Sequence, residues 1–121
     1  MVAAEKGATV EAIPVDVDGV LDLAALQDML DERVKMVACG HVSNALGTVN
    51  PVEQVIRLAH GVGALTLIDG AQAVSHWPVD MQALDCDFTC FPRTSCWPDG
   101  AGCAVWQGSA AGCHAALSGR W

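Results

Sequence analysis

The apolar segment at residues 65–68 stops at a group of polar residues whose types could bind a small ligand. Asp69 and Gly70 follow the segment at once, and Gln72 comes shortly afterwards. An aliphatic strand that ends in an acid puts a carboxylate at the carboxyl edge of a sheet, where open α/β sheets bind their ligands. The alternative is an ordinary Asp-Gly turn in which Asp69 caps the next helix. Taken alone, these two residues fit both interpretations equally well.

The surrounding sequence distinguishes the two interpretations. Three motifs follow one another along the chain, at residues 41–51 (HVSNALGTVNP), 65–76 (LTLIDGAQAVSH) and 76–88 (HWPVDMQALDCDF). Together they closely resemble the class V aminotransferase superfamily, above all its cysteine desulfurase and selenocysteine lyase branch, whose members use pyridoxal 5′-phosphate. The resemblance runs without a gap from about residue 8 to residue 88. It implies an α/β fold, namely part of the large domain of a pyridoxal-phosphate-dependent transferase, with a parallel-rich sheet and crossover helices.

The resemblance also implies roles for three residues. Asp69 matches the acid that pairs with the pyridinium nitrogen and so makes the cofactor ring an electron sink. Gln72 matches the residue that hydrogen-bonds the phenolic oxygen of the ring, and Asn44 matches the active-site asparagine near the same edge. From residue type alone, Asn44 could instead satisfy the backbone of its own turn, and Gln72 could be an exposed residue of a first helical turn. The motif match favours cofactor binding by Asn44, Asp69 and Gln72.

The Schiff-base lysine of the family has no counterpart in this chain. Thr94 or Ser95 occupies its position, and neither side chain can form an imine. The two lysines of the chain, Lys6 and Lys35, precede the strand that ends at Asp69 and lie in no matching motif. The phosphate-binding turn and the ring-stacking histidine of the family would come before the first residue, and the sulfur-accepting cysteine and the substrate-binding arginine after the last. We therefore assign no catalytic residue and expect the chain as written to be inactive.

Residues 89–121 differ in composition from the rest of the chain. They hold one Val, one Leu, no Ile and no Met, but three of the four Trp and four of the six Cys. When residues 88–97 are back-translated and one T is restored before the codon of Thr89, the new frame gives Phe-Tyr-Leu-Phe-Ser-Ala-His-Lys-Leu-Leu, which contains the family's lysine motif. One G restored before the codon of Pro98 gives Gly-Pro-Thr and then Gly-Val-Leu-Tyr, as in the family. We therefore interpret residues 1–88 as a fragment of the cofactor-binding domain and residues 89–121 as an out-of-frame, irregular tail.

The cysteines predict no metal site. The chain contains no Cys-x-x-Cys pair, and His114 beside Cys113 is the only companion that a metal ion would find there. Structural zinc sites need four such ligands at close spacing. We interpret the cysteines and tryptophans of the tail as products of the altered reading frame.

The charge and length of the chain exclude several classes of function. Six Lys and Arg against 14 Asp and Glu give a net charge of −8, whereas nucleic acids and anionic membranes require a basic surface. No apolar stretch approaches the roughly 18 residues of a membrane span, and Glu5 and Lys6 interrupt the region where a signal peptide has its apolar core. We expect one cytoplasmic domain that binds neither nucleic acid nor membrane.

Alternating strands and helices must hold the candidate residues in place. Residues 8–13 are expected to form a strand and residues 14–19 a turn. The next element is a helix capped by Asp22, and its apolar stripe consists of Leu23, Leu26, Met29 and Leu30. Residues 34–39 are expected to form a second strand.

The second helix has the clearer boundary signals. Asn50 is expected at the N-cap, Pro51 at the first helical position, Glu53 in a capping box and Gly61 at the end. Its apolar stripe consists of Val52, Val55, Ile56 and Ala59. A strand into Asp69 follows, so strand, helix and strand with short connections predict a parallel sheet.

The resemblance implies a fragment of a cysteine desulfurase. Such an enzyme converts L-cysteine to L-alanine and passes the sulfur as a persulfide to an acceptor protein, which supplies iron–sulfur cluster assembly; L-selenocysteine is the substrate in the close variant. The parent protein would be a homodimer. Two alternatives remain, another class V aminotransferase or lyase and a non-catalytic scaffold with the same αβ fold.

Overall fold

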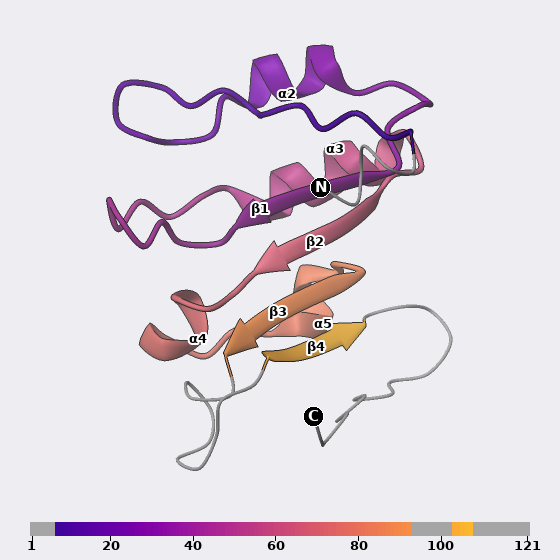
Figure 1. The fold of residues 1–121 in the computed structure, drawn as a ribbon. Coiled ribbons are helices and arrows are strands. Elements are labelled where there is room, and N and C mark those ends of the chain that lie inside the picture. The colour runs from indigo at the N-terminus through magenta and orange to yellow at the C-terminus, as the bar shows by residue number, and fades with distance from the viewer. Residues whose placement is uncertain (1–6, 93–102, 108–121) are drawn as a thin grey trace.

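A four-stranded sheet with helices packed on it forms the centre of the molecule (Figure 1). The computed structural model describes residues 7–92 and 103–107. The elements are, in chain order, α2 (Leu23–Met29), β1 (Met36–Gly40), α3 (Val52–Gly61), β2 (Leu65–Asp69), α4 (Ala73–His76), α5 (Met81–Leu84), β3 (Phe88–Pro92) and β4 (Cys103–Gln107). The strand order is β1-β2-β3-β4; the first three strands are parallel, and β4 is antiparallel to β3.

Burial in β2 alternates, because successive side chains of a strand point to opposite faces of the sheet. Thr66 and Ile68 are fully buried, whereas Leu65 and Asp69 are exposed. Ile68 belongs to a cluster that includes residues of α3 and α5, so these helices cover the buried face. Asp69 therefore belongs to the opposite face, which the helices leave open.

The first helix and the turn before it form as the sequence predicts. The Asp22 carboxylate caps α2 by accepting hydrogen bonds from the amides of Ala24 and Ala25, both at 3.0 Å. Asp16 Oδ1 accepts from the amides of Asp18 and Val20 at 2.9 Å and so closes the preceding turn. Both carboxylates satisfy amides that a tight turn or a helix start leaves without a backbone partner.

Helix α3 holds the two parts of the core together. All four residues of its predicted stripe are buried, namely Val52, Val55, Ile56 and Ala59. Val55 and Ala59 pack with Leu26 of α2 and Val37 of β1, whereas Val52 and Ile56 pack on the β2 side with Leu84 of α5. One helix therefore fixes β1, β2 and both neighbouring helices.

The predicted ends of α3 need two corrections. Pro51 occupies the N-cap position and makes no side-chain hydrogen bond there. Asn50, the predicted cap, instead donates its side-chain amide to the carbonyl of Gly40 at 2.8 Å. Gly61 is the last helical residue, and the left-handed backbone of the chain reversal falls on Gly63, with φ of 75°. The Asn50 side chain thus directs its amide to a strand-end carbonyl, and its Oδ1 accepts no hydrogen bond from the helix amides.

Residues 8–13 are not a strand, contrary to our prediction. Residues 8–12 are exposed, and within the described part of the chain they pair with no strand. β1 is the edge of the described sheet. An extended segment becomes a strand only when a neighbour supplies the ladder of backbone hydrogen bonds.

The prediction of an irregular chain from Thr89 onward is wrong for two segments. Thr89 continues β3, and Cys103–Gln107 form β4 against it. Thr89 is fully buried, and its hydroxyl lies 2.9 Å from the Cys86 thiol. Residues 93–102 and 108–121 lie outside the described residues. The division of the chain at residue 88 and the out-of-frame origin of the tail stay predictions.

No helix in the described part is long and apolar enough to cross a membrane.

Asp87 ties β2 to the segment that leads into β3. Its Oδ2 accepts hydrogen bonds from the amide and hydroxyl of Thr66, at 2.8 and 2.9 Å, and lies 3.0 Å from His60 Nε2 at the end of α3. The Asp87 amide in turn donates to the Thr66 hydroxyl. Burial alone would raise the pKa of Asp87, but the hydrogen bonds from His60 and Thr66 outweigh it, and the pKa lies below its usual value.

Replacing Asp87 with Ala should lower the free energy of unfolding by about 1 to 3 kcal/mol, because the buried Thr66 donors lose their acceptor. Since the folded-state pKa of Asp87 is lowered, its contribution is present above the unfolded pKa and is lost as the pH falls through the folded value. Urea denaturation at a series of pH values should show the difference from the parent chain shrink on acidification. Asp28→Ala, at an exposed position of α2, is the control. Equal losses in both variants would refute the role of Asp87.

Candidate active site

The three residues predicted to bind a cofactor line one cleft of about 520 Å³. The cleft lies at the carboxyl ends of β1 and β2, which coincide because Gly40 is the register partner of Asp69. Asp69 and Gln72 come from the end of β2 and the turn after it, and Asn44 from the loop between β1 and α3. The lining residues are Val15, Gly19, Leu21, Gly40, Val42, Ser43, Asn44, Leu46, Asn50, Asp69, Ala71 and Gln72.

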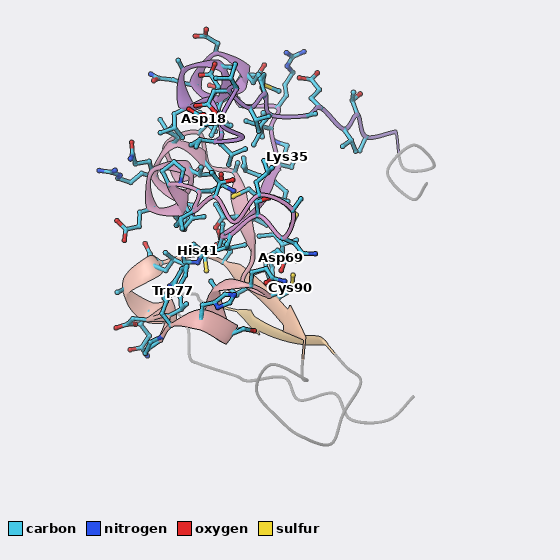
Figure 2. The ribbon with its side chains drawn as sticks, turned by 90° about the vertical axis from the view of Figure 1, so that its left-hand side faces the viewer. Asp18, Lys35, His41, Asp69, Trp77 and Cys90 are labelled. Carbon is cyan, nitrogen blue, oxygen red and sulfur yellow. The ribbon has the colours of Figure 1, made fainter. Side chains whose placement is uncertain are left out.

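Asp69 takes part in a turn and still faces solvent. Its Oδ1 accepts a hydrogen bond from the amide of Ala71 at 2.9 Å, as the turn interpretation predicts. Within residues 7–92 and 103–107, Oδ2 accepts no hydrogen bond, and the side chain is exposed at the cleft. Figure 2 shows Asp69 beside Cys90, its register partner on β3. The two interpretations are therefore compatible, since one oxygen holds the turn and the other is available to a ligand.

Gly70 lets the chain leave β2 close against β3. Its amide donates to the carbonyl of Cys90 at 2.9 Å. A Cβ atom at Gly70 would lie 3.3 Å from Cγ2 of Thr89 and 3.7 Å from Cγ1 of Val74. The side chain of Gln72, two residues on, is half-buried at the cleft and makes no hydrogen bond to the start of α4. The close turn at Gly70 thus brings Gln72 to the same cleft as Asp69.

The loop that carries Asn44 satisfies its backbone without the Asn44 side chain. The amide of Ser43 donates to the carbonyl of Thr48, and that of Gly47 to the carbonyl of Ser43, both at 2.9 Å. The Ser43 hydroxyl accepts from the amide of Leu46 at 3.2 Å. Asn44 is exposed, and its amide makes no hydrogen bond within the described residues. Ser43 thus satisfies the backbone of the turn, which is the role that the alternative interpretation assigned to Asn44. The Asn44 amide is therefore available to a ligand.

Lys35, the one lysine in the part of the chain that the structure describes, does not line this cleft. Lys35 precedes β1, and its carbonyl accepts from the amide of Leu65 at the start of β2. It therefore lies at the amino ends of the strands whose carboxyl ends form the cleft, and its Nζ donates to the carbonyl of Glu32 at 2.9 Å. Figure 2 shows Lys35 well apart from Asp69. Lys6, Thr94 and Ser95 lie outside the described residues.

Comparison with known proteins identifies the family. The family model for class V aminotransferases matches residues 1–103. The chain belongs to the class V aminotransferase family. This match runs past Phe88, where we expected the resemblance to end.

Several relatives of this class V chain are cysteine desulfurases. A cysteine desulfurase of Dickeya dadantii is 55% identical over 91 residues, which cover 75% of this chain and 22% of the relative. The solved cysteine desulfurase CsdA of Escherichia coli superimposes with a TM-score of 0.79 at 31% identity, over 89% of this chain and 27% of that one. The apo cysteine desulfurase of Thermococcus onnurineus gives a TM-score of 0.74 at 34% identity, over 85% of this chain and 26% of that one. The chain thus spans about a fifth of the length of the curated relatives it matches.

The comparisons confirm the predicted fold class, part of the large domain of this transferase family. The parallel pairing of β1, β2 and β3 and the helices between them are shared with these structures. Sequence reasoning missed one residue of the site, Asn50, which lines the cleft. Its place before Pro51 had indicated a helix cap instead. The role of Asn50 depends on its closeness to the Gly40 carbonyl, which exists only in the folded chain.

A second hollow of about 420 Å³ lies near His41 and Trp77, between the starts of α3 and α5. The two rings meet edge to face with their centroids 6.0 Å apart, and Figure 2 shows them on the helix side of the sheet. Burial lowers the pKa of His41, and the negative charge of Glu53 partly opposes this. His41 thus packs against Trp77 at this hollow.

Removing the charge of Glu53 should lower the pKa of His41 further. In Glu53→Gln, burial continues to disfavour the imidazolium form while the stabilising carboxylate is gone. Titration of the His41 ring protons by nuclear magnetic resonance measures the shift, and Glu32→Gln serves as the remote control. A His41 pKa that rises or stays the same in Glu53→Gln would contradict the structure.

Proposed function

We propose that this chain forms part of the cofactor-binding domain of a pyridoxal-phosphate-dependent cysteine desulfurase. The observation that carries the proposal is the convergence of Asn44, Asp69 and Gln72 on one cleft, in a chain whose relatives are named cysteine desulfurases. Each of the three offers a polar group that the protein's own turns leave available. Nothing observed favours a scaffold or another class V reaction over this one.

The donor set of the cleft fits the ring of pyridoxal 5′-phosphate. The ring has a basic nitrogen at one edge and a phenolic oxygen at another, so it needs an acid and amide donors in different places. Asp69 supplies the acid, and Gln72 and Asn44 supply amides. When bound, the cofactor supplies an electron sink for the carbanion at the α carbon of the substrate.

The residues of this chain would bind and orient the ring. Asp69 Oδ2 would hold a proton on the ring nitrogen, while its Oδ1 stays with the amide of Ala71. A carboxylate in that position keeps the nitrogen charged, because an ion pair favours the charged form of both partners. Gln72 and Asn44 would fix the rotation of the ring by hydrogen bonds to the phenolic oxygen.

The whole protein would act on L-cysteine, or on L-selenocysteine, in the cytoplasm. It would release L-alanine and pass sulfur to an acceptor protein for iron–sulfur cluster assembly, as a homodimer. Covalent attachment of the cofactor needs an amine, and Lys35 lies at the opposite ends of the strands. The chain alone would therefore bind the ring without turning over cysteine.

The proposed reading-frame change after Phe88 accounts for the missing lysine. In the restored frame, the codons around residues 103–106 give Gly-Val-Leu-Tyr, a strand in the family. β4, at Cys103–Gln107, falls on these residues and pairs with β3. This agreement in position supports the proposal that residues 89–121 are an out-of-frame tail.

Binding of pyridoxamine 5′-phosphate tests the assigned roles, because this analogue keeps the ring nitrogen and the phenolic oxygen but cannot react with an amine. Asp69→Asn should weaken its binding about ten- to a hundredfold, the effect of losing a charge-assisted hydrogen bond of about 1.5 to 3 kcal/mol. Calorimetric titration measures the affinity. Asp28→Asn, at an exposed acid of α2 that does not line the cleft, should change nothing. Equal affinity of Asp69→Asn and the parent chain would refute the site.

Turnover supplies an independent test of the chain as written. Incubation with pyridoxal 5′-phosphate and L-cysteine should give no L-alanine, because no lysine amine lies at the cleft in the described structure. Amino-acid analysis of the reaction mixture measures this. Production of L-alanine above that of the free cofactor would contradict the assignment.

A further inference from the structure

Residues 41–50 form a hairpin that projects from the carboxyl end of β1 and carries Asn44. Val42 and Val49 pair as an antiparallel bridge near its base, and Ser43 and Thr48 bond next to them. At the base itself, the amide of Asn50 donates to the carbonyl of His41 at 2.9 Å. The hairpin is thus closed on itself by backbone bonds, and these bonds alone do not fix its position on the sheet.

Two hydrogen bonds attach this hairpin to the strand ends. The amide of His41 donates to the carbonyl of Asp69 at 2.8 Å, which joins the hairpin to β2. The side-chain amide of Asn50 donates to the carbonyl of Gly40 at 2.8 Å, which joins the C-terminal end of the hairpin to β1. Gly40 and Asp69 are register partners, so both bonds act at one level of the sheet.

The Asn50 side chain has little freedom to act otherwise. Reversing its amide would bring Oδ1 against the Gly40 carbonyl, and two acceptors cannot share a hydrogen bond. The carbonyl of Asn50 accepts from the amide of Val52 at 2.8 Å, which fixes the start of α3. Asn50 Oδ1 is buried, and within the described residues it has no hydrogen-bond partner. The bond to Gly40 therefore sets the orientation of the Asn50 side-chain amide.

We propose that Asn50 is a positioning residue for the cofactor site: by bonding Gly40, it holds the Asn44 hairpin across the cleft from Asp69. The inference rests on the proposed function. Asn50 itself need not touch the ring, because it acts through the hairpin, whose C-terminal end it anchors. Without the Asn50 side chain, the C-terminal end of the hairpin loses its bond to β1 and keeps its backbone bonds to His41 and Val52. Asn44 can then move away from the ring edge while Asp69 stays on β2.

A double-mutant cycle tests this mechanism. If Asn50 acts through Asn44, then Asn44→Ala and Asn50→Ala should each weaken binding of pyridoxamine 5′-phosphate about tenfold, and the double variant should be no weaker than either. Calorimetric titration measures the three affinities. Gln54→Ala, an exposed residue early in α3, is the matched control and should bind as the parent chain does.

A purely structural role of Asn50 predicts a different pattern. It would make the two losses of affinity additive, about a hundredfold in the double variant, and this result would overturn the proposal. So would unchanged affinity in Asn50→Ala. Should that variant fail to fold, Asn50→Asp keeps the size of the side chain but cannot donate when ionised, and it should show the same non-additivity with Asn44→Ala. An additive result with Asn50→Asp would likewise overturn the proposal.

The outcomes separate this inference from the function on which it rests. Failure of the proposed function appears as unchanged binding in both Asp69→Asn and Asn44→Ala. If those two variants lose affinity and Asn50→Ala does not, the positioning role alone fails. Amide hydrogen exchange of Ser43 and Gly47 gives a readout without ligand: exchange should accelerate in Asn50→Ala and stay unchanged in Gln54→Ala.

Discussion

The parallel pairing of β1 with β2, in the register that aligns Gly40 with Asp69, is the constraint on which the cleft depends. Because the two strands end at one level, the segments that follow them leave the sheet side by side. The bond from the His41 amide to the Asp69 carbonyl extends the ladder by one step and joins these segments. A shift of one residue would turn Asp69 to the helix-covered face, since side chains alternate along a strand.

The register is itself held by α3. This helix buries Val55 and Ala59 against the β1 side of the core and Val52 and Ile56 against the β2 side. Sliding one strand along the other would disturb both sets of contacts. At the opposite ends of the strands, Thr66 and Asp87 exchange hydrogen bonds and His60 lies against the same carboxylate. Polar groups that stabilise the fold and polar groups available to a ligand thus occupy opposite ends of the same sheet.

The sequence predicted those elements whose signals are local. Asp22 caps α2, and the stripe of α3 is buried as its spacing requires. The apolar run before Asp69 is a strand, with the acid at its carboxyl end. Family motifs identified Asn44, Asp69 and Gln72, which do line one cleft. The predictions failed for residues 8–13, for residues 89–92 and 103–107, and for Asn50, where the outcome depended on a partner distant in the sequence.

The sequence by itself determined the identity of the polar groups, the helix faces and the absence of a lysine after Asp69. Tertiary structure alone decided which of those groups meet. Pairing with β3 made a strand of Cys103–Gln107, a segment without a period-2 pattern. Residues 8–13 have no strand partner among the residues that the structure describes and are not a strand. The side-chain amide of Asn50 donates to the carbonyl of Gly40, and the side chain does not cap the helix that follows it. The physical reason is the same in each case, because a backbone or amide hydrogen bond needs a partner, and only the folded chain brings that partner within reach.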